Sequence, residues 1–253
     1  MKKCKATLLA LAILAAVPSA RAADDEIQVY TDEINKPGEL GLELHLNYVT
    51  VGSRARAWPQ QVPPRQLFRT TPEFSYGLAE RWELGLYLPT TKGPGEDLHL
   101  EGGKARLKYL DAPQERPFYW GVNVELGRLA LRTVEQNWNA EIRPILGYRA
   151  GDWHYTFNPR LGMALSGGAS RVPDFNPCFR IMRKLSDDWA VGVEHYSEFG
   201  PVNRFLPASE RAQNTYLVLD GRIEKMDFNI GVGKGWTGPS DRVVFKAILG
   251  FNF

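Results

Sequence analysis

His195 and Ser197 are the two residues of this chain whose types and spacing best suit covalent chemistry. A histidine that accepts the proton of a serine hydroxyl makes that oxygen a nucleophile, and a carboxylate usually orients the ring. Residues two apart in a strand lie on the same face, so the two side chains would meet. The acid is badly placed, because Glu198 would point to the opposite face and Glu210 would lie in the next loop. We therefore name no catalytic residue and keep this pair as an alternative.

Metal and cofactor chemistry has less support. The four histidines, His45, His99, His154 and His195, are scattered along the chain without the spacing of a ligand set. The alternating glycines at 231–235 are not followed by a helical pattern, as a phosphate-binding loop would require. The sequence predicts neither a metal site nor a bound cofactor.

The elements that must position any of these residues are strands. Leucines at the even positions of 40–46 alternate with Glu43, His45 and glycine, and the range 118–126 repeats the pattern with aromatic and aliphatic residues. A period of two with one apolar and one mixed face is typical of a strand whose two sides meet different surroundings. About twelve such segments follow one another, and no helical period of useful length competes with them.

The connections between these segments alternate in length. Long connections, such as 51–66 and 199–212, are separated by short ones, such as 150–152 and 224–226. This sorting is typical of membrane barrels, whose long loops gather at one end and short turns at the other. The predicted fold is all-β, a transmembrane antiparallel up-and-down β-barrel of about twelve strands.

The final segment, 243–253, alternates in the same way and ends on Phe253. It resembles the closing strand of bacterial outer-membrane barrel proteins, which usually ends with Phe or Trp. The segments 139–148, 189–196 and 229–253 also look like an uncharacterised proteobacterial outer-membrane β-barrel family, loosely similar to barrels linked with aromatic-compound uptake. The resemblance implies an outer-membrane location. Because its motifs are structural, it implies no substrate and no functional residue.

The chain divides into three predicted parts. Residues 1–22 have the basic start, short apolar run and Ala-x-Ala end of a secretory signal peptide. Residues 23–38 are predicted to be a periplasmic lead, and residues 39–253 to form the barrel. The residues after position 22 hold 27 Lys and Arg against 29 Asp and Glu, so the charge balance does not favour nucleic acid as a partner.

In such a barrel the polar face lines the lumen, where unpaired charges would be costly and must pair or meet water. The predicted lumen-lining residues are Glu43, His45, Glu73, Glu83, Arg106, Lys108, Glu125, Glu141, Arg143, Arg149, Arg160, Arg180, Glu194 and Lys246. Aromatic residues at corresponding strand ends predict a girdle at the periplasmic membrane surface. Its members are Trp82, Trp120, Trp153, Trp189, Tyr148, Phe251 and Phe253.

The predicted function is a narrow channel or transporter for small solutes, because about twelve strands lie between the filled eight-stranded barrels and the open porins. A sealed structural barrel is the first alternative. The second is an esterase that modifies lipid A through His195 and Ser197, whose spacing is similar to that of the outer-membrane lipid A deacylases. The expected partners are outer-membrane lipid and lipopolysaccharide, and the outer-membrane insertion machinery through the closing strand. The oligomeric state stays open.

Overall fold

The computed structural model describes residues 26–167 and 171–253, so the predicted signal peptide at 1–22 lies outside the described residues. The described chain is built of strands, with one 3-10 turn at Ala208–Glu210. The first strands are β1 Leu40–Val51, β2 Phe68–Ala79, β3 Trp82–Tyr87, β4 Thr90–Lys92, β5 His99–Leu100, β6 Gly102–Asp111, β7 Phe118–Leu129, β8 Trp138–Ala150 and β9 Trp153–Asn158. The others are β10 Leu161–Ala164, β11 Asp174–Phe175, β12 Cys178–Lys184, β13 Trp189–Ser197, β14 Gly200–Pro201, β15 Gln213–Ile223, β16 Met226–Gly235 and β17 Val243–Asn252. The described residues contain no helix that is long and apolar enough to cross a membrane.

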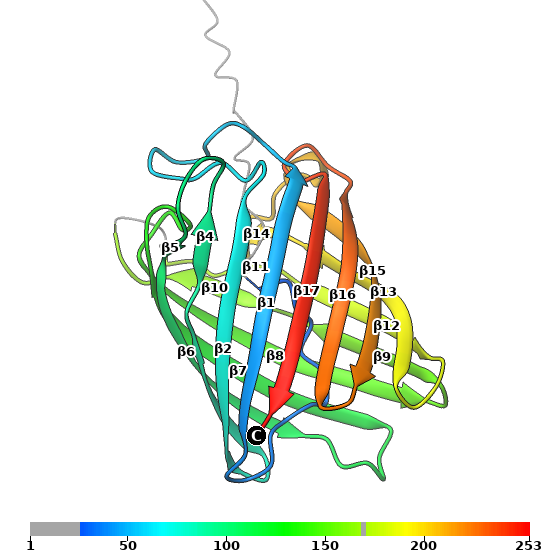
Figure 1. The fold of residues 1–253 in the computed structure, drawn as a ribbon. Helices are drawn as coiled ribbons and strands as arrows, with labels where there is room; N and C mark the ends of the chain where they lie inside the picture. Colours follow the sequence, from blue (N-terminus) through cyan, green and yellow to red (C-terminus); the bar gives the residue numbers. More distant parts are fainter. Residues whose placement is uncertain (1–25, 168–170) are drawn as a thin grey trace, which may run out of the picture.

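These strands form one closed antiparallel barrel (Figure 1). Each strand pairs with its neighbours in the chain, and β17 returns to pair with β1 from Gly41↔Asn252 to Val51↔Val243. Several short strands continue one another: β4 extends β3, β5 precedes β6, β10 extends β9, β11 precedes β12 and β14 extends β13. When each short strand is counted together with the strand that it continues or precedes, the barrel wall has twelve strands. This confirms the predicted fold class.

Prolines lie at two of the places where one wall strand is interrupted and divided into two short strands. Pro159 separates β9 from β10, and Pro177 separates β11 from β12. Proline has no backbone N–H to give to the ladder, so the strand pairing stops there. Pro72 and Pro144, in contrast, remain inside β2 and β8, opposite Leu44 and Val122.

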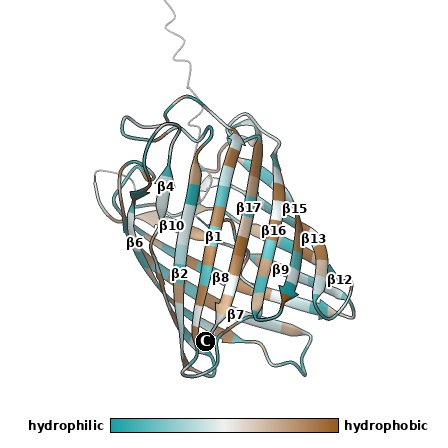
Figure 2. Ribbon diagram, in the orientation of Figure 1, coloured by the Kyte–Doolittle hydropathy of each residue, from teal (hydrophilic) through white to brown (hydrophobic). Residues whose placement is uncertain are grey.

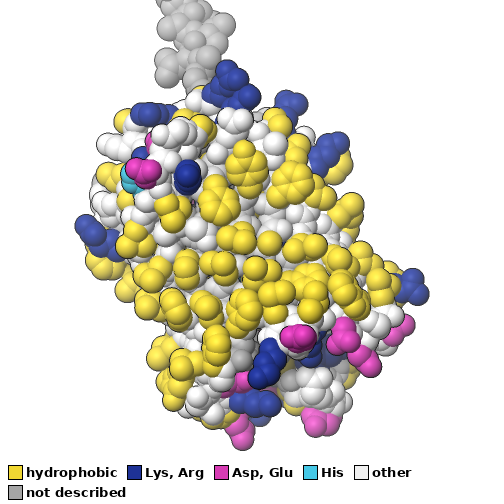
Figure 3. Space-filling model, viewed as in Figure 1, with side chains coloured by type: hydrophobic (Ala, Val, Ile, Leu, Met, Phe, Trp, Pro, Cys, Tyr) yellow, Lys and Arg dark blue, Asp and Glu magenta, His cyan; other side chains and the backbone are white. Residues whose placement is uncertain are grey.

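The barrel is apolar outside and polar inside. Along β7, Trp120 and Leu126 are exposed on the outer face, whereas Asn123 and Glu125 are buried on the inner face. Figure 2 shows the same alternation along the neighbouring strands, and Figure 3 shows hydrophobic side chains covering the middle of the visible wall. A soluble protein has the opposite arrangement, so the outer face is one that lipid would cover.

The connections sort to two ends, as predicted. The long ones, such as 52–67 and 202–212, meet at the end that we call the long-loop end, at the top of Figure 1. The short ones, such as 151–152 and 224–225, meet at the opposite end, the turn end, beside the C-terminus. Gly151 has a φ of +59°, which a turn of two residues between antiparallel strands favours.

The described N-terminal segment differs from the prediction of a periplasmic lead. We name residues 26–36 the inner segment, because they run inside the barrel before the chain turns into β1 (Figure 1). Ile27, Val29 and Tyr30 are buried there. The sequence at 26–30 has the alternation of a strand, but inner side chains, and not a neighbouring strand, satisfy much of its backbone. The segment is thus held inside the barrel by side-chain contacts, which alternation along the sequence does not record.

Candidate functional site

The barrel interior is the candidate site, because nearly every strand of the wall contributes charged side chains to it. All fourteen predicted lumen residues are on the inner face: Glu43, Glu141 and Arg149 are partly buried and the other eleven are buried. Charges removed from water are costly unless they are paired and hydrogen-bonded. The interior therefore has to be understood as sets of ion pairs.

The first set lies on β2, β3 and β6. The Arg106 guanidinium bridges two carboxylates, with its Nε 2.7 Å from Glu73 Oε1 and its Nη2 2.7 Å from Glu83 Oε1. Lys108 Nζ lies 2.8 Å from the same Glu83 oxygen. Gly85 faces Arg106 across the ladder, and a Cβ there would lie 2.6 Å from Arg106 Cγ. Because glycine has no side chain, the Arg106 side chain has space to lie against the wall at this position.

The second set lies on the far side of the barrel. Lys246 Nζ, on β17, lies 2.5 Å from Glu194 Oε2 on β13, and the Tyr196 hydroxyl donates to the same oxygen at 2.7 Å. Arg180 on β12 is 3.5 Å from Glu194 and also pairs with Asp220. Arg180 and Glu194 face each other on the neighbouring strands β12 and β13. The Lys246–Glu194 contact instead joins β17 to β13, across the two strands between them, β15 and β16.

A third set joins β8 to the chain after β9. Arg143 Nη2 lies 2.7 Å from Glu141 Oε1, and Arg160 Nε lies 3.6 Å from Glu141 Oε2.

Glu43, His45 and Glu73 offer three ligand atoms within 4.8 Å of one another. Their approach follows from the register, because Glu43 faces Glu73 across the β1–β2 ladder and His45 lies two residues further on the same face. Sequence spacing alone missed this, since the ligand pair on β1 needs a third residue from another strand. His45 Nε2 is 3.0 Å from Glu73, while Arg106 and Gln28 already donate to the two carboxylates. A cation there would compete with a guanidinium, so the set fits an ion-pair network better than a metal centre.

Tyr30 is the main anchor of the inner segment. Its backbone N–H donates to Asn158 Oδ1 at 2.7 Å, and Asn158 Nδ2 donates to the Tyr30 carbonyl at 3.0 Å. Its hydroxyl bonds to the Tyr87 hydroxyl and to Glu125 Oε1 at 3.2 Å. The Arg143 guanidinium lies 4.4 Å from the ring centroid, within cation–π range. No motif in the sequence distinguished Tyr30 as a functional residue.

Further contacts hold the rest of the inner segment. Lys104 Nζ donates to Glu26 at 2.5 Å, and Arg149 Nη2 lies 2.6 Å from Asp32. The backbone N–H of Asn35 donates to Glu83 at 2.7 Å. The segment is therefore held by polar side chains along its length and not by strand pairing.

Loop 52–67 is tied across the long-loop end. Trp58 Nε1 donates to the Leu131 carbonyl at 2.6 Å, and the Val62 N–H donates to the Arg132 carbonyl at 3.0 Å. Arg132 in turn donates to Glu96 at 2.6 Å and holds the pKa of that carboxyl below its usual range. Three loops are thereby joined over one end of the barrel.

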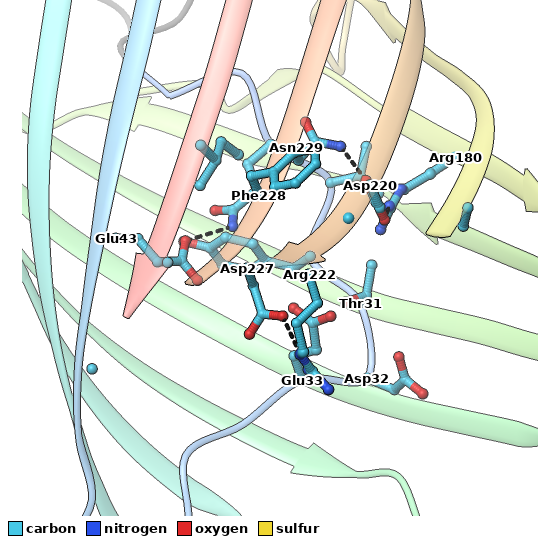
Figure 4. A pocket seen from close by; sticks show the side chains of 18 of the residues that line it. Thr31, Asp32, Glu33, Glu43, Arg180, Asp220, Arg222, Asp227, Phe228 and Asn229 are labelled. Atoms are coloured by element: carbon cyan, nitrogen blue, oxygen red, sulfur yellow. Dashed lines mark hydrogen bonds and ion pairs between the residues drawn. The ribbon is translucent and has the colours of Figure 1, made fainter. Parts of the chain in front are cut away.

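A cavity of about 500 Å³ opens near the turn end, between the inner segment and the wall (Figure 4). Its lining includes Thr31 and Glu33 of the inner segment, together with Arg180, Asp220 and Asn229 of the wall. This is an aqueous space beside the segment, and charged side chains surround it.

His195 and Ser197 meet as the spacing required. By the alternation of β13 both belong to its outer face, where His195 is partly buried and Ser197 is buried, and His195 Nε2 is 2.9 Å from Ser197 Oγ. The other ring nitrogen is 2.8 Å from Thr215 Oγ1, and Trp236 Nε1 donates to the same hydroxyl at 2.9 Å. A threonine thus holds the ring at the place where hydrolases use a carboxylate, and a neutral hydroxyl stabilises an imidazolium less.

The predicted girdle residues lie at the turn end. Trp82, Trp120, Tyr148, Trp153 and Trp189 are exposed on the outer face, and Phe253 is the most exposed residue of the set. The rings contact further aromatics: Tyr109 lies between Trp82 and Trp120, with ring centroids 5.0 and 5.4 Å away, and Phe228 lies 5.5 Å from Trp189. Phe251 is partly buried, opposite Leu42.

Comparison with solved structures defines the class of this fold. The chain is similar to an outer membrane channel from Pseudomonas putida F1, with a TM-score of 0.59 and 11% sequence identity. The match covers 88% of this chain and 97% of the channel chain. The NanC porin matches 85% of this chain and 98% of its own, with a TM-score of 0.54 and 11% identity. The chain has the fold of bacterial outer-membrane barrels, as its closing strand predicted, and the bacterial outer membrane is the location that belongs to this fold. No family model and no curated protein matches the sequence.

Proposed function

We propose that the protein is a narrow outer-membrane channel for small solutes, and that the inner segment closes it in the state described here. The observation that carries this proposal is the way in which the segment is held. Tyr30 and its neighbours bind the wall through side-chain contacts, whereas the wall itself is complete without them. The segment can therefore leave without the loss of a strand.

The interior supports passage of solutes and not a sealed apolar core. Its ion pairs are arranged around the segment, and a cavity of about 500 Å³ leads to the segment from the turn end. In the proposed orientation the turn end faces the periplasm, and the aromatic girdle lies at that membrane surface. The apolar wall contacts outer-membrane lipid and lipopolysaccharide, and the insertion machinery recognises β17.

Planar-bilayer recording tests this proposal. The refolded mature chain is expected to show small, discrete conductance steps, and a chain that lacks residues 24–36 should show steps several times larger. Arg143→Glu and Arg160→Glu should shift the reversal potential under a salt gradient if these side chains line the path. A folded full-length protein and a folded truncated protein that both stay silent would refute the channel and support the sealed barrel.

A second candidate function follows from the 2.9 Å contact between His195 and Ser197 on the outer wall. His195 is partly exposed on the outer wall, with Ser197 buried beside it, so the substrate of this pair would be the acyl esters of lipid A. The test is release of fatty acid from lipid A vesicles by the refolded protein and by Ser197→Ala. Activity that is absent, or that survives the substitution, removes this candidate.

A further inference from the structure

The cavity at the turn end has an excess of negative charge. Ten carboxylates line it against five Lys and Arg side chains. Several of them are paired, for example Arg180 with Asp220 and Arg222 with Asp227 at 2.6 Å. Figure 4 shows these pairs on the wall of the cavity, with Thr31 and Glu33 of the inner segment beside them.

Within the described part of the chain, three of the lining carboxylates form no ion pair with Lys or Arg. Glu33 and Asp188 make no side-chain hydrogen bond or ion pair with the described residues. Among residues 26–167 and 171–253, the Glu43 carboxylate contacts the Gln28 amide and the His45 ring. Glu33 and Asp188 are exposed, so a positively charged ligand in the cavity would reach their carboxylates.

A second, separate observation concerns hydrogen-bond acceptors. The Thr31 side chain is 8% exposed, lines the cavity, and its hydroxyl has no partner among residues 26–167 and 171–253. Asn229 Oδ1 is an acceptor atom that is itself buried without a donor. A buried acceptor of this kind is costly unless a donor reaches it. Unused acceptors beside unbalanced carboxylates fit a ligand that is positively charged and rich in N–H groups.

The arrangement argues against a single metal ion. The one group of three close metal-type ligands within the described ranges is Glu43, His45 and Glu73, where Arg106 and Gln28 already donate. Glu33 and Asp188 belong to no such group. Because these carboxylates are not clustered, they suit a ligand that carries several separated positive charges.

We infer that this cavity binds linear polyamines, alkyl chains with two or more protonated nitrogens. The ammonium groups would contact Glu33 and Asp188, and their N–H bonds would reach Thr31 and Asn229. That such amines are also the transported solute rests on the proposed channel function, whereas the binding itself does not.

Titration calorimetry with spermidine tests the inference on the full mature chain, refolded without lipopolysaccharide in a zwitterionic detergent. Spermidine should bind, and the double variant Glu33→Gln/Asp188→Asn should weaken binding roughly tenfold, because two charge-assisted hydrogen bonds are lost. Thr31→Val should weaken it by a smaller factor. The control is Glu80→Gln/Glu210→Gln, which removes the same charge at exposed turns outside the cavity.

Equal spermidine affinity in the two double variants would overturn the inference. So would full competition by magnesium chloride at matched ionic strength, which would indicate simple counter-ion attraction. The outcome is distinguishable from that of the channel proposal. Binding by a protein that is silent in bilayers refutes the channel alone, and conductance without spermidine binding refutes the polyamine site alone.

Discussion

At the scale of single residues, several buried charges of the interior have more than one partner. Glu194 contacts Lys246, Arg180 and the Tyr196 hydroxyl, so no one partner carries its whole charge. The positions of such residues on the inner face were predictable from a period of two. Their partners were not, because Glu194 and Lys246 come from strands separated by β15 and β16.

The Glu194–Lys246 contact yields a stability prediction. Lys246→Met leaves a buried carboxylate with weaker compensation, and the free energy of unfolding should fall by roughly 3 kcal/mol. The double variant Glu194→Gln/Lys246→Met should recover most of this loss, since no unbalanced charge remains. Urea unfolding in micelles measures both, with Lys225→Met in an exposed turn as the control. Equal losses in the single and double variants would contradict the pairing.

At the scale of elements, the inner segment is not part of the sheet that forms the barrel wall. Its backbone depends on side chains of the barrel, above all on Asn158, which binds both the N–H and the carbonyl of Tyr30. Hydrogen bonds of this kind contribute about 1 kcal/mol each, so a few of them separate the seated segment from a released one.

Asn158→Ala should therefore release the inner segment more often. Loss of its two hydrogen bonds, about 2 kcal/mol, corresponds to an increase of roughly thirtyfold in the ratio of released to seated states. In bilayers this should appear as more frequent openings with unchanged step size. Asn137→Ala, which removes an amide bound to the Leu129 carbonyl at the long-loop end, serves as the control. Unchanged opening in Asn158→Ala would mean that the segment does not gate the path.

At the scale of the whole molecule, closure of β1 on β17 removes every free sheet edge, which lets a polar backbone cross lipid. The apolar outer wall and the paired interior then reinforce each other. In the proposed membrane location, lipid would cover the exposed aromatic and aliphatic side chains, while the ion pairs lie inside the closed wall.

A closed barrel of this kind should be heat-modifiable. The folded chain is expected to keep its β-structure in cold SDS and to migrate differently on a gel before and after boiling. A chain without residues 243–253 cannot close, and should show a single position under both conditions. Identical migration of the full chain before and after boiling would contradict the closed barrel.

The sequence by itself determined the wall of this protein. Alternation along 40–48 or 118–126 decides which side chains face out, and loop lengths decide which ends meet, because both signals are local. The tertiary structure alone decided that residues 26–36 lie inside and that Glu43, His45 and Glu73 converge. It also decided that, among the described residues, the Glu33 carboxylate has no ion-pair partner and the Thr31 hydroxyl has no hydrogen-bond partner. These facts depend on register, on contacts across the barrel and on what fills its interior, none of which a period of two records. The His195–Ser197 pair illustrates what each of the two determines. Spacing predicted that His195 would reach Ser197, and only the fold showed that Thr215 holds the ring in place of an acid.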